Sequence, residues 1–87
     1  MEYVRTLILF QLIGPVCATI SDGDSINRIV KNLLDQGCSV KLDFHGVKLV
    51  TPSFYAAVVS DLHSVFPENV LNTRFALTGM PDSHSLS

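Results

Sequence analysis

The stretch from Val40 to Phe54 constrains the fold of this 87-residue chain more than any other. In its first five residues, apolar side chains alternate with Lys41 and Asp43, which is the period of a strand with one covered face. A short loop follows, and a Thr-Pro-Ser sequence then precedes a new apolar stripe, which indicates the start of a helix. A strand followed so closely by a helix predicts a crossover unit, in which helices join mainly parallel strands and pack on their sheet.

Two amphipathic stripes at helical spacing predict helices over residues 24–36 and 53–66. We expect Asp24 or Ser25 to cap the first helix after a loop at 21–24, and Gly37 to end it. Ser53 is expected to cap the second helix, and Pro67 marks its end. The stripes consist of Ile26, Ile29, Val30, Leu33 and Leu34 in the first, and Phe54, Ala57, Val58, Leu62 and Val65 in the second.

Three other segments have the composition of strands: Val4–Leu12, a short antiparallel return at 16–20, and Arg74–Thr78. The element order predicts one α/β domain over residues 1–78, with a small mixed, mainly parallel sheet of about four strands and two helices on one face. Residues 79–87 are polar and are expected to form a flexible C-terminal tail. The expected core joins Leu42 and Phe44 to Ile29, Leu33, Val58 and Leu62.

The chain is unusually apolar for its length, since 47% of its residues are hydrophobic. A domain of this size buries only about 60% of the surface of its unfolded chain. We therefore expect another protein or a second copy to cover part of the apolar surface. The net charge is −2 and the six basic residues are dispersed, so no nucleic-acid partner is expected. No apolar run reaches the ~18 residues of a membrane span, so no membrane association is expected either.

The two cysteines, Cys17 and Cys38, have no Cys-x-x-Cys spacing and are too few for the disulfide framework of a small secreted domain. We expect both to be buried, reduced thiols in a cytoplasmic protein. The apolar run after Arg5 could also be a secretory signal, but Glu2 and Gln11 interrupt that pattern and favour a strand.

The residues that could carry chemistry form no recognisable catalytic or metal motif. Asp43, His45 and Ser53 could form a hydrolase triad, but no Gly-x-Ser-x-Gly turn is present, and we expect Asp43 to order the following loop instead. His63 and His84 add no metal-ligand spacing to His45. The Asp-Gly-Asp-Ser sequence at 22–25 lacks the later Glu of a calcium loop. We therefore expect no catalytic residue, no metal and no cofactor.

The pattern Val-x-Leu-Asp-Phe-x-Gly-Val at 40–47, followed by Thr-Pro-Ser-Phe at 51–54, resembles the STAS-like domains of unknown function. These are distant relatives of the STAS domains in bacterial anti-sigma factor antagonists. The resemblance implies a STAS-like α/β module without enzymatic activity. Such a module would act in bacterial or phage regulation by binding or blocking a partner protein.

The antagonists carry an Asp-Ser-Ser-Gly motif at the corresponding turn, and one of its serines is phosphorylated. In this chain only Ser53 matches that motif, because Thr51, Pro52 and Phe54 replace its other positions. The resemblance thus implies an alternative function, a phosphorylatable switch with Ser53 as the site.

The partner-binding surface is expected on or beside the Val4–Leu12 segment. STAS-like domains usually carry a further helix after the last strand, and this sequence ends before one could form. An uncovered sheet face or edge invites a partner. We expect a homodimer or a complex with another protein, with Leu7, Leu9, Thr51 and Ser53 as contact residues.

Overall fold

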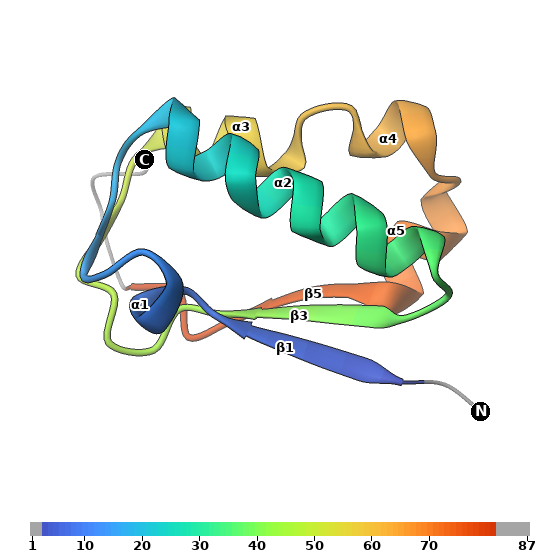
Figure 1. Ribbon diagram of the computed structural model, residues 1–87, viewed down its shortest axis with the longest axis horizontal. Coiled ribbons are helices and arrows are strands. Elements are labelled where there is room, and N and C mark those ends of the chain that lie inside the picture. Colours follow the sequence, from blue (N-terminus) through green and yellow to red (C-terminus); the bar gives the residue numbers. More distant parts are fainter. Residues whose placement is uncertain (1–2, 82–87) are drawn as a thin grey trace.

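The computed structural model describes residues 3–81, which form a small α/β domain (Figure 1). β1 (Val4–Ile8), β3 (Ser39–Asp43) and β5 (Phe75–Thr78) make a three-stranded sheet in the order β1-β3-β5, and β2 (Val16–Cys17) pairs with β4 (Leu49–Val50). All three strand pairs are parallel. The helices are α1 (Leu9–Leu12), α2 (Ile20–Asp35), α3 (Pro52–Val59), α4 (Leu62–Val65) and α5 (Glu68–Arg74). The predicted α/β class with mainly parallel strands is confirmed, although the strands divide between two sheets.

The three-stranded sheet has one covered and one open face. α2 and α3 lie on the same side of it (Figure 1). The register aligns Leu7, Leu42 and Leu77 in one row, and Leu42 in the middle of that row is fully buried. The neighbouring row consists of Thr6, Lys41 and Ala76, which point to the opposite face and are all exposed. The helices therefore cover one face only.

The N-terminal segment departs from the predicted strand. β1 ends at Ile8, and the next four residues form the helical turn α1, in which the Ile13 N–H donates to the Leu9 carbonyl at 2.8 Å. This turn directs Leu9 into the core, where it is fully buried. The predicted return strand is only two residues long and runs parallel to β4, not antiparallel, because the turn at Gly14 carries the chain past the end of β1.

α2 begins four residues before its predicted start. Thr19, and not Asp24 or Ser25, is the N-cap: its hydroxyl accepts the Asp22 N–H at 3.1 Å. Residues 21–24, which were predicted to form a loop, therefore belong to the first turn of the helix. The predicted end is confirmed, because Gly37 adopts φ +88° and its N–H donates to the Leu34 carbonyl at 3.0 Å.

The second predicted helix is divided into α3 and α4, and Ser53 does not cap it. Thr51 is the N-cap of α3, since its hydroxyl accepts the Phe54 N–H at 3.2 Å. α3 ends at Val59, and Asp61 adopts a left-handed conformation with φ +67° before α4 begins. Pro67 stands at the start of α5, which was not predicted because Leu71 is its only buried residue.

The predicted core is largely confirmed. Leu42, Phe44, Val58 and Leu62 are each at most 1% exposed. Ile29 and Leu33 are half-buried at the margin of the core instead, because they lie beside a groove between α2 and β1. Of the expected tail, residues 82–87 with His84 lie outside the described residues, whereas Met80 is half-buried and packs against the core.

Gly23 sets the distance between α2 and α3. A Cβ atom at this position would lie 2.6 Å from the Ala57 Cβ and 2.7 Å from the Phe54 carbonyl oxygen. Because one of these neighbours is backbone, the helices would have to separate. We expect Gly23→Ala to destabilise the domain by roughly 1–2 kcal/mol, as overpacking outweighs the higher helix propensity of alanine.

Urea unfolding of the Gly23→Ala variant measures this effect. Arg28→Ala, at an exposed position of the same helix, is the matched control and should change stability by less than about 0.5 kcal/mol. A Gly23→Ala variant as stable as the parent would show that the two helices do not need this close approach.

Candidate functional site

Exposed apolar side chains concentrate at the N-terminal end of the chain. Among the described residues, seven of the ten large hydrophobic side chains that are exposed belong to residues 3–20, and Leu49 pairs with one of them, Val16. We call the part formed by β1, α1 and the β2–β4 pair the N-terminal apolar surface. It consists of Tyr3, Val4, Ile8, Phe10, Leu12, Val16 and Leu49.

Backbone contacts hold this surface in place. The Phe10 ring lies against Gly46, where an added Cβ atom would be 3.2 Å from Cδ1 of the ring. Gly46 has φ +89° and no side chain, so the loop after β3 can pass beneath the ring. The β2–β4 pair is extended by a hydrogen bond from the Lys48 N–H to the Pro15 carbonyl at 2.8 Å. The side chains are thus presented on ordered backbone.

Leu7 and Leu9 do not share a free face, contrary to the sequence-based expectation. Leu7 is half-buried on β1 and lines a groove of about 550 Å³ with Ile29 and Leu33 of α2. Leu9 is fully buried, so it cannot contact a partner without unfolding of α1. Only Leu7 of this pair remains a candidate contact residue.

Thr51 and Ser53 at the start of α3 have different environments. The Thr51 hydroxyl accepts the Phe54 N–H and donates to the Ala18 carbonyl at 3.1 Å, which joins α3 to the segment before α2. Ser53 lies in the first turn and is exposed. Thr51 therefore has a structural role in this turn, whereas the Ser53 hydroxyl is open to solvent.

The structure brings Asp43 and His45 together. The Asp43 Oδ1 atom accepts the His45 backbone N–H at 2.9 Å and lies 2.7 Å from Nδ1 of the same residue. The backbone hydrogen bond, followed by the side-chain one, lowers the pKa of Asp43. The expectation that Asp43 orders the following loop is confirmed. No contact joins Ser53 to this pair within residues 3–81.

The lowered pKa of Asp43 predicts how the loop responds to acid. A carboxyl group whose pKa is depressed by folding stabilises the native state above its unfolded pKa, and this stabilisation is lost as the pH falls through the folded pKa. We expect the Asp43 carboxyl to titrate below the ordinary aspartate range, with the His45 amide signal shifting in parallel, as followed by NMR. An ordinary midpoint for Asp43 would contradict the hydrogen bonds to His45.

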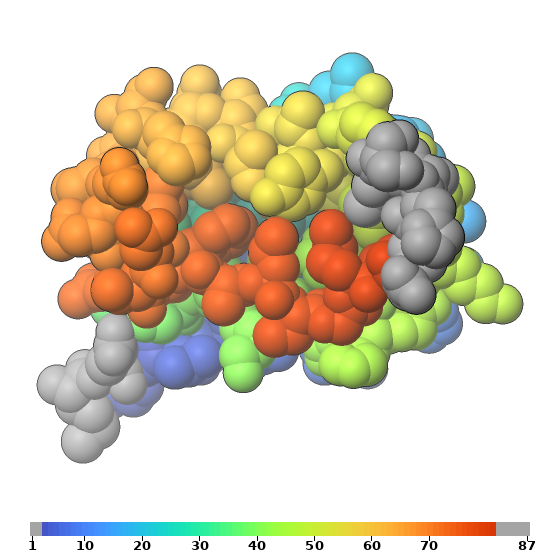
Figure 2. Space-filling view, turned by 180° about the vertical axis from the view of Figure 1, so that it is seen from behind, coloured from blue at the N-terminus to red at the C-terminus, as the bar shows by residue number. Residues whose placement is uncertain are grey.

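A second apolar groove lies between α3 and β5. It has a volume of about 510 Å³ and continues toward Pro52 and Met80 through the shared residues Tyr55 and Leu77. Figure 2 shows this side of the molecule, with β5 at the surface below α3 and α4. The groove is lined by Tyr55, Val59, Leu62, His63, Leu71, Asn72, Phe75 and Leu77.

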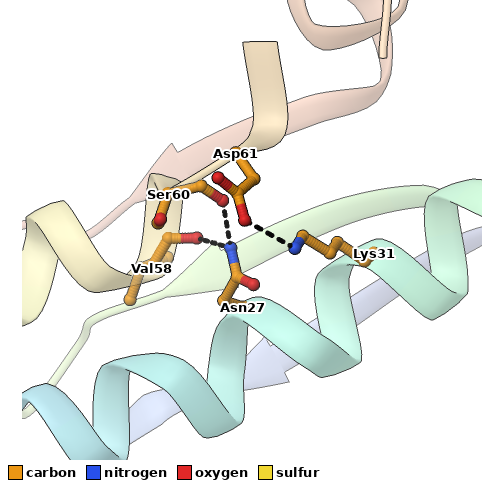
Figure 3. A network of polar contacts seen from close by, with 5 residues as sticks. All are labelled: Asn27, Lys31, Val58, Ser60 and Asp61. Atoms are coloured by element: carbon orange, nitrogen blue, oxygen red, sulfur yellow. Dashed lines mark hydrogen bonds and ion pairs between the residues drawn. The ribbon is translucent and has the colours of Figure 1, made fainter. Parts of the chain in front are cut away.

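Asn27 positions the α3–α4 junction that borders this groove. Its Nδ2 atom donates to the Val58 carbonyl at 2.8 Å and to the Ser60 carbonyl at 2.7 Å, while Lys31 one turn later pairs with Asp61 at 3.3 Å (Figure 3). Asn27 is only 6% exposed. Asn27 was not among the predicted site residues; the available signal was an asparagine directly after Ile26 of the apolar stripe of α2.

The two cysteines lie in different environments. Both cysteines are free, and Cys38 is half-buried rather than buried as expected. Burial raises the pKa of the Cys17 thiol, and the nearby Asp22 carboxylate adds to this effect. No group of three or more His, Cys, Asp or Glu side chains in residues 3–81 could hold a metal ion. No helix in the same range is long and apolar enough to cross a membrane.

Comparison with known proteins gives one match. The family model described as a STAS-like domain of unknown function (DUF4325) matches residues 22–84. No curated protein and no solved structure matches the chain. The matched region begins within α2, so β1, α1 and β2 lie before it.

Proposed function

The chain belongs to the family of STAS-like domains of unknown function, and on this basis we propose that it is a non-enzymatic protein–protein interaction module. The module acts in bacterial or phage regulation by binding or blocking a partner protein. Its contact region is the N-terminal apolar surface, all of which except Leu49 lies before the part of the chain that matches the family model.

The concentration of exposed apolar side chains on this surface carries the proposal. Phe10 is 45% exposed, Leu12 52% and Val16 51%. Each square ångström of such surface removed from water contributes about 25 cal/mol, from which the entropy and ordering costs of association are subtracted. Several large apolar side chains left exposed on consecutive elements of a small domain are typical of a protein contact.

Phe10 is the expected centre of the contact. Aromatic side chains that lose little conformational freedom on binding contribute a large share of interface energies. The ring of Phe10 already rests on Gly46, so a partner that covers it has little further ordering to impose. Val16 and Leu49 extend the surface as register partners on the small sheet.

Affinity purification from the organism that encodes the protein tests the proposal. We expect the parent chain to enrich a specific protein at least about tenfold over the variant Phe10→Asp/Leu12→Asp, because a buried unpaired charge costs several kcal/mol. Val65→Asp is the matched control, since Val65 is 54% exposed but lies on α4. Equal recovery with the parent and the double variant would contradict this contact region.

Ser53 supports a second candidate function, a phosphorylatable switch of the anti-sigma factor antagonist type. The specific observation is that Thr51 makes the capping hydrogen bond, so a phosphate on the exposed Ser53 would leave the cap intact. The phosphate would place about two negative charges near the first-turn N–H groups and the apolar groove at Pro52 and Tyr55.

Intact-mass analysis of the protein from its native source should then show one phosphate that Ser53→Ala abolishes. A parent chain that carries no phosphate would exclude the switch.

A further inference from the structure

We propose that a second copy of this chain binds the β1 part of the N-terminal apolar surface, by antiparallel pairing of two β1 strands about a twofold axis at Thr6. This inference rests on the proposed function and names the partner at one part of its surface. It follows from the direction of the β1 backbone groups, the self-complementary order of the β1 side chains and the groove beside the strand.

The outer edge of β1 has unpaired hydrogen-bonding groups. Within residues 3–81, β1 pairs with β3 alone, and the Tyr3 carbonyl accepts the Ser39 N–H at 2.7 Å, so the backbone groups of Tyr3 point toward β3. These groups alternate in direction along a strand. The N–H and carbonyl groups of Val4 and Thr6 and the N–H of Ile8 therefore point away from the sheet, whereas the Ile8 carbonyl belongs to the N-cap of α1.

A twofold axis at Thr6 uses most of these outward groups. An antiparallel pair centred there places Thr6 opposite Thr6 of the second copy, and Val4 opposite Ile8 in both directions. The two Thr6 residues exchange two hydrogen bonds, and the Ile8 N–H of each copy donates to the Val4 carbonyl of the other, which gives about four in total. An axis at Arg5 would instead place two like charges opposite each other, which is destabilising.

The same register covers exposed apolar side chains. Val4 is 59% exposed and Ile8 37%, and both lie on the open face of the sheet with Thr6. Opposite side chains of an antiparallel pair have Cβ atoms about 5 Å apart, so Val4 of each copy would shield Ile8 of the other. One strand sequence thus supplies both halves of an apolar cross-strand pair.

The helix-covered side contributes the rest of the contact. There, the groove of about 550 Å³ between β1 and α2 is lined by Leu7, Ile29 and Leu33, all half-buried. Pairing of the β1 strands places the grooves of the two copies next to each other. With Tyr3, Val4 and Ile8, these residues would have to cover about 600 Å² per copy to reach the lower end for specific interfaces. This is about a tenth of the total surface of 5340 Å².

The edge also lacks the features that usually prevent such pairing. β1 contains no proline, and Arg5 is its only charged residue. Pairing of β1 with the other sheet edge, β5, would leave a free edge at each end and would continue into filaments. Pairing of β1 with β1 consumes the same edge in both copies and closes as a dimer.

A cysteine on the axis tests the register. In a hydrogen-bonded antiparallel pair the Cα atoms are about 5.5 Å apart, which suits a disulfide. In a Cys38→Ser background, we expect Thr6→Cys to form a disulfide-linked dimer at least about tenfold faster than Ala76→Cys under mild oxidation. Ala76 is the matched control, because it is exposed in the same cross-strand row. Equal rates would overturn the proposed axis.

The molar mass in solution, measured by light scattering, provides the second test of the dimer. The parent should show twice the 9.5 kDa chain mass at tens of micromolar, and Thr6→Pro should show a single chain, because it removes an outward N–H that β1 does not use in the monomer. A monomeric parent at about 100 µM, or a Thr6→Pro variant that still dimerises, would overturn the inference. If Thr6→Pro unfolds, as seen by circular dichroism, the cysteine rates decide.

The outcome also separates this inference from the proposed function. A parent that is monomeric but still enriches a host protein in a manner dependent on Phe10 would exclude the dimer and retain the interaction module. A β1-linked dimer whose host contacts do not depend on Phe10 would support the dimer and contradict the proposed contact with another protein.

Discussion

Leu42→Ala is expected to remove a large share of the stability of the domain at 25 °C. Leu42 lies on the central strand β3, is fully buried and has Leu7 and Leu77 as its register partners on either side. Truncation of such a leucine costs about 2–5 kcal/mol, because apolar contacts are lost and a cavity remains. A domain of this length has a total stability of only roughly 4–13 kcal/mol.

Urea unfolding followed by circular dichroism measures this loss. Lys41→Ala is the matched control: it changes the next residue of the same strand, whose exposed side chain points to the open face. We expect the control to remain within about 0.5 kcal/mol of the parent. A Leu42→Ala variant that melts within a degree or two of the parent would contradict the position of β3 in the core.

Asn27→Asp is expected to cost about 2–4 kcal/mol, although it changes only one polar atom of a side chain. The amide of Asn27 donates to the carbonyl groups of Val58 and Ser60, and a carboxylate would face both with lone pairs instead. Each buried acceptor left without a donor costs about 1–3 kcal/mol. The α3–α4 junction should therefore loosen, and Leu62 with it.

The pH dependence distinguishes this cause from a general loss of packing. The introduced carboxyl faces two carbonyl oxygens in a buried position, so its folded pKa is expected to lie above its unfolded pKa. The destabilisation should therefore be largest above the folded pKa and should decrease as the pH falls through it. Asn32→Asp, at an exposed position of the same helix, is the control. A loss of stability in Asn27→Asp equal to that of the control would contradict the role of Asn27.

The sequence was sufficient to predict the elements whose pattern extends over many residues. The strand at 39–43, the first long helix and its end at Gly37 follow from a regular apolar period and a glycine stop. The core residues Leu42 and Phe44 follow from the same alternation. The family resemblance was carried by this region, and the family model matches residues 22–84.

The predicted secondary structure was wrong where a single tertiary contact, and not the local apolar pattern, determined the conformation of the chain. A helix at 53–66 was expected from the stripe, but Asn27 binds the carbonyls of Val58 and Ser60, and this contact ends α3 at Val59. The apolar run from Val4 to Leu12 has strand composition throughout, yet the turn at α1 buries Leu9 and leaves its neighbours exposed. Local composition does not specify either contact, because the partners are distant in the sequence.

The candidate site was predicted only in outline. The sequence predicts a partner surface on or beside residues 4–12, which stays a prediction, and Val4, Ile8, Phe10 and Leu12 are exposed there. Two of the predicted contact residues have structural roles instead, because Leu9 is buried in the core and the Thr51 hydroxyl caps α3. Phe10 was not singled out, because its exposure depends on the end of β1 at Ile8 and on the glycine loop beneath its ring.

Photo-crosslinking in living cells tests the proposed interaction module most directly. A photoreactive phenylalanine analogue at position 10, in the organism that encodes the protein, would report whether another chain covers Phe10. We predict a discrete crosslinked product with the analogue at position 10, and little product with the analogue at position 65, which is similarly exposed on α4. The same weak, diffuse products at both positions would contradict a protein contact at the N-terminal apolar surface.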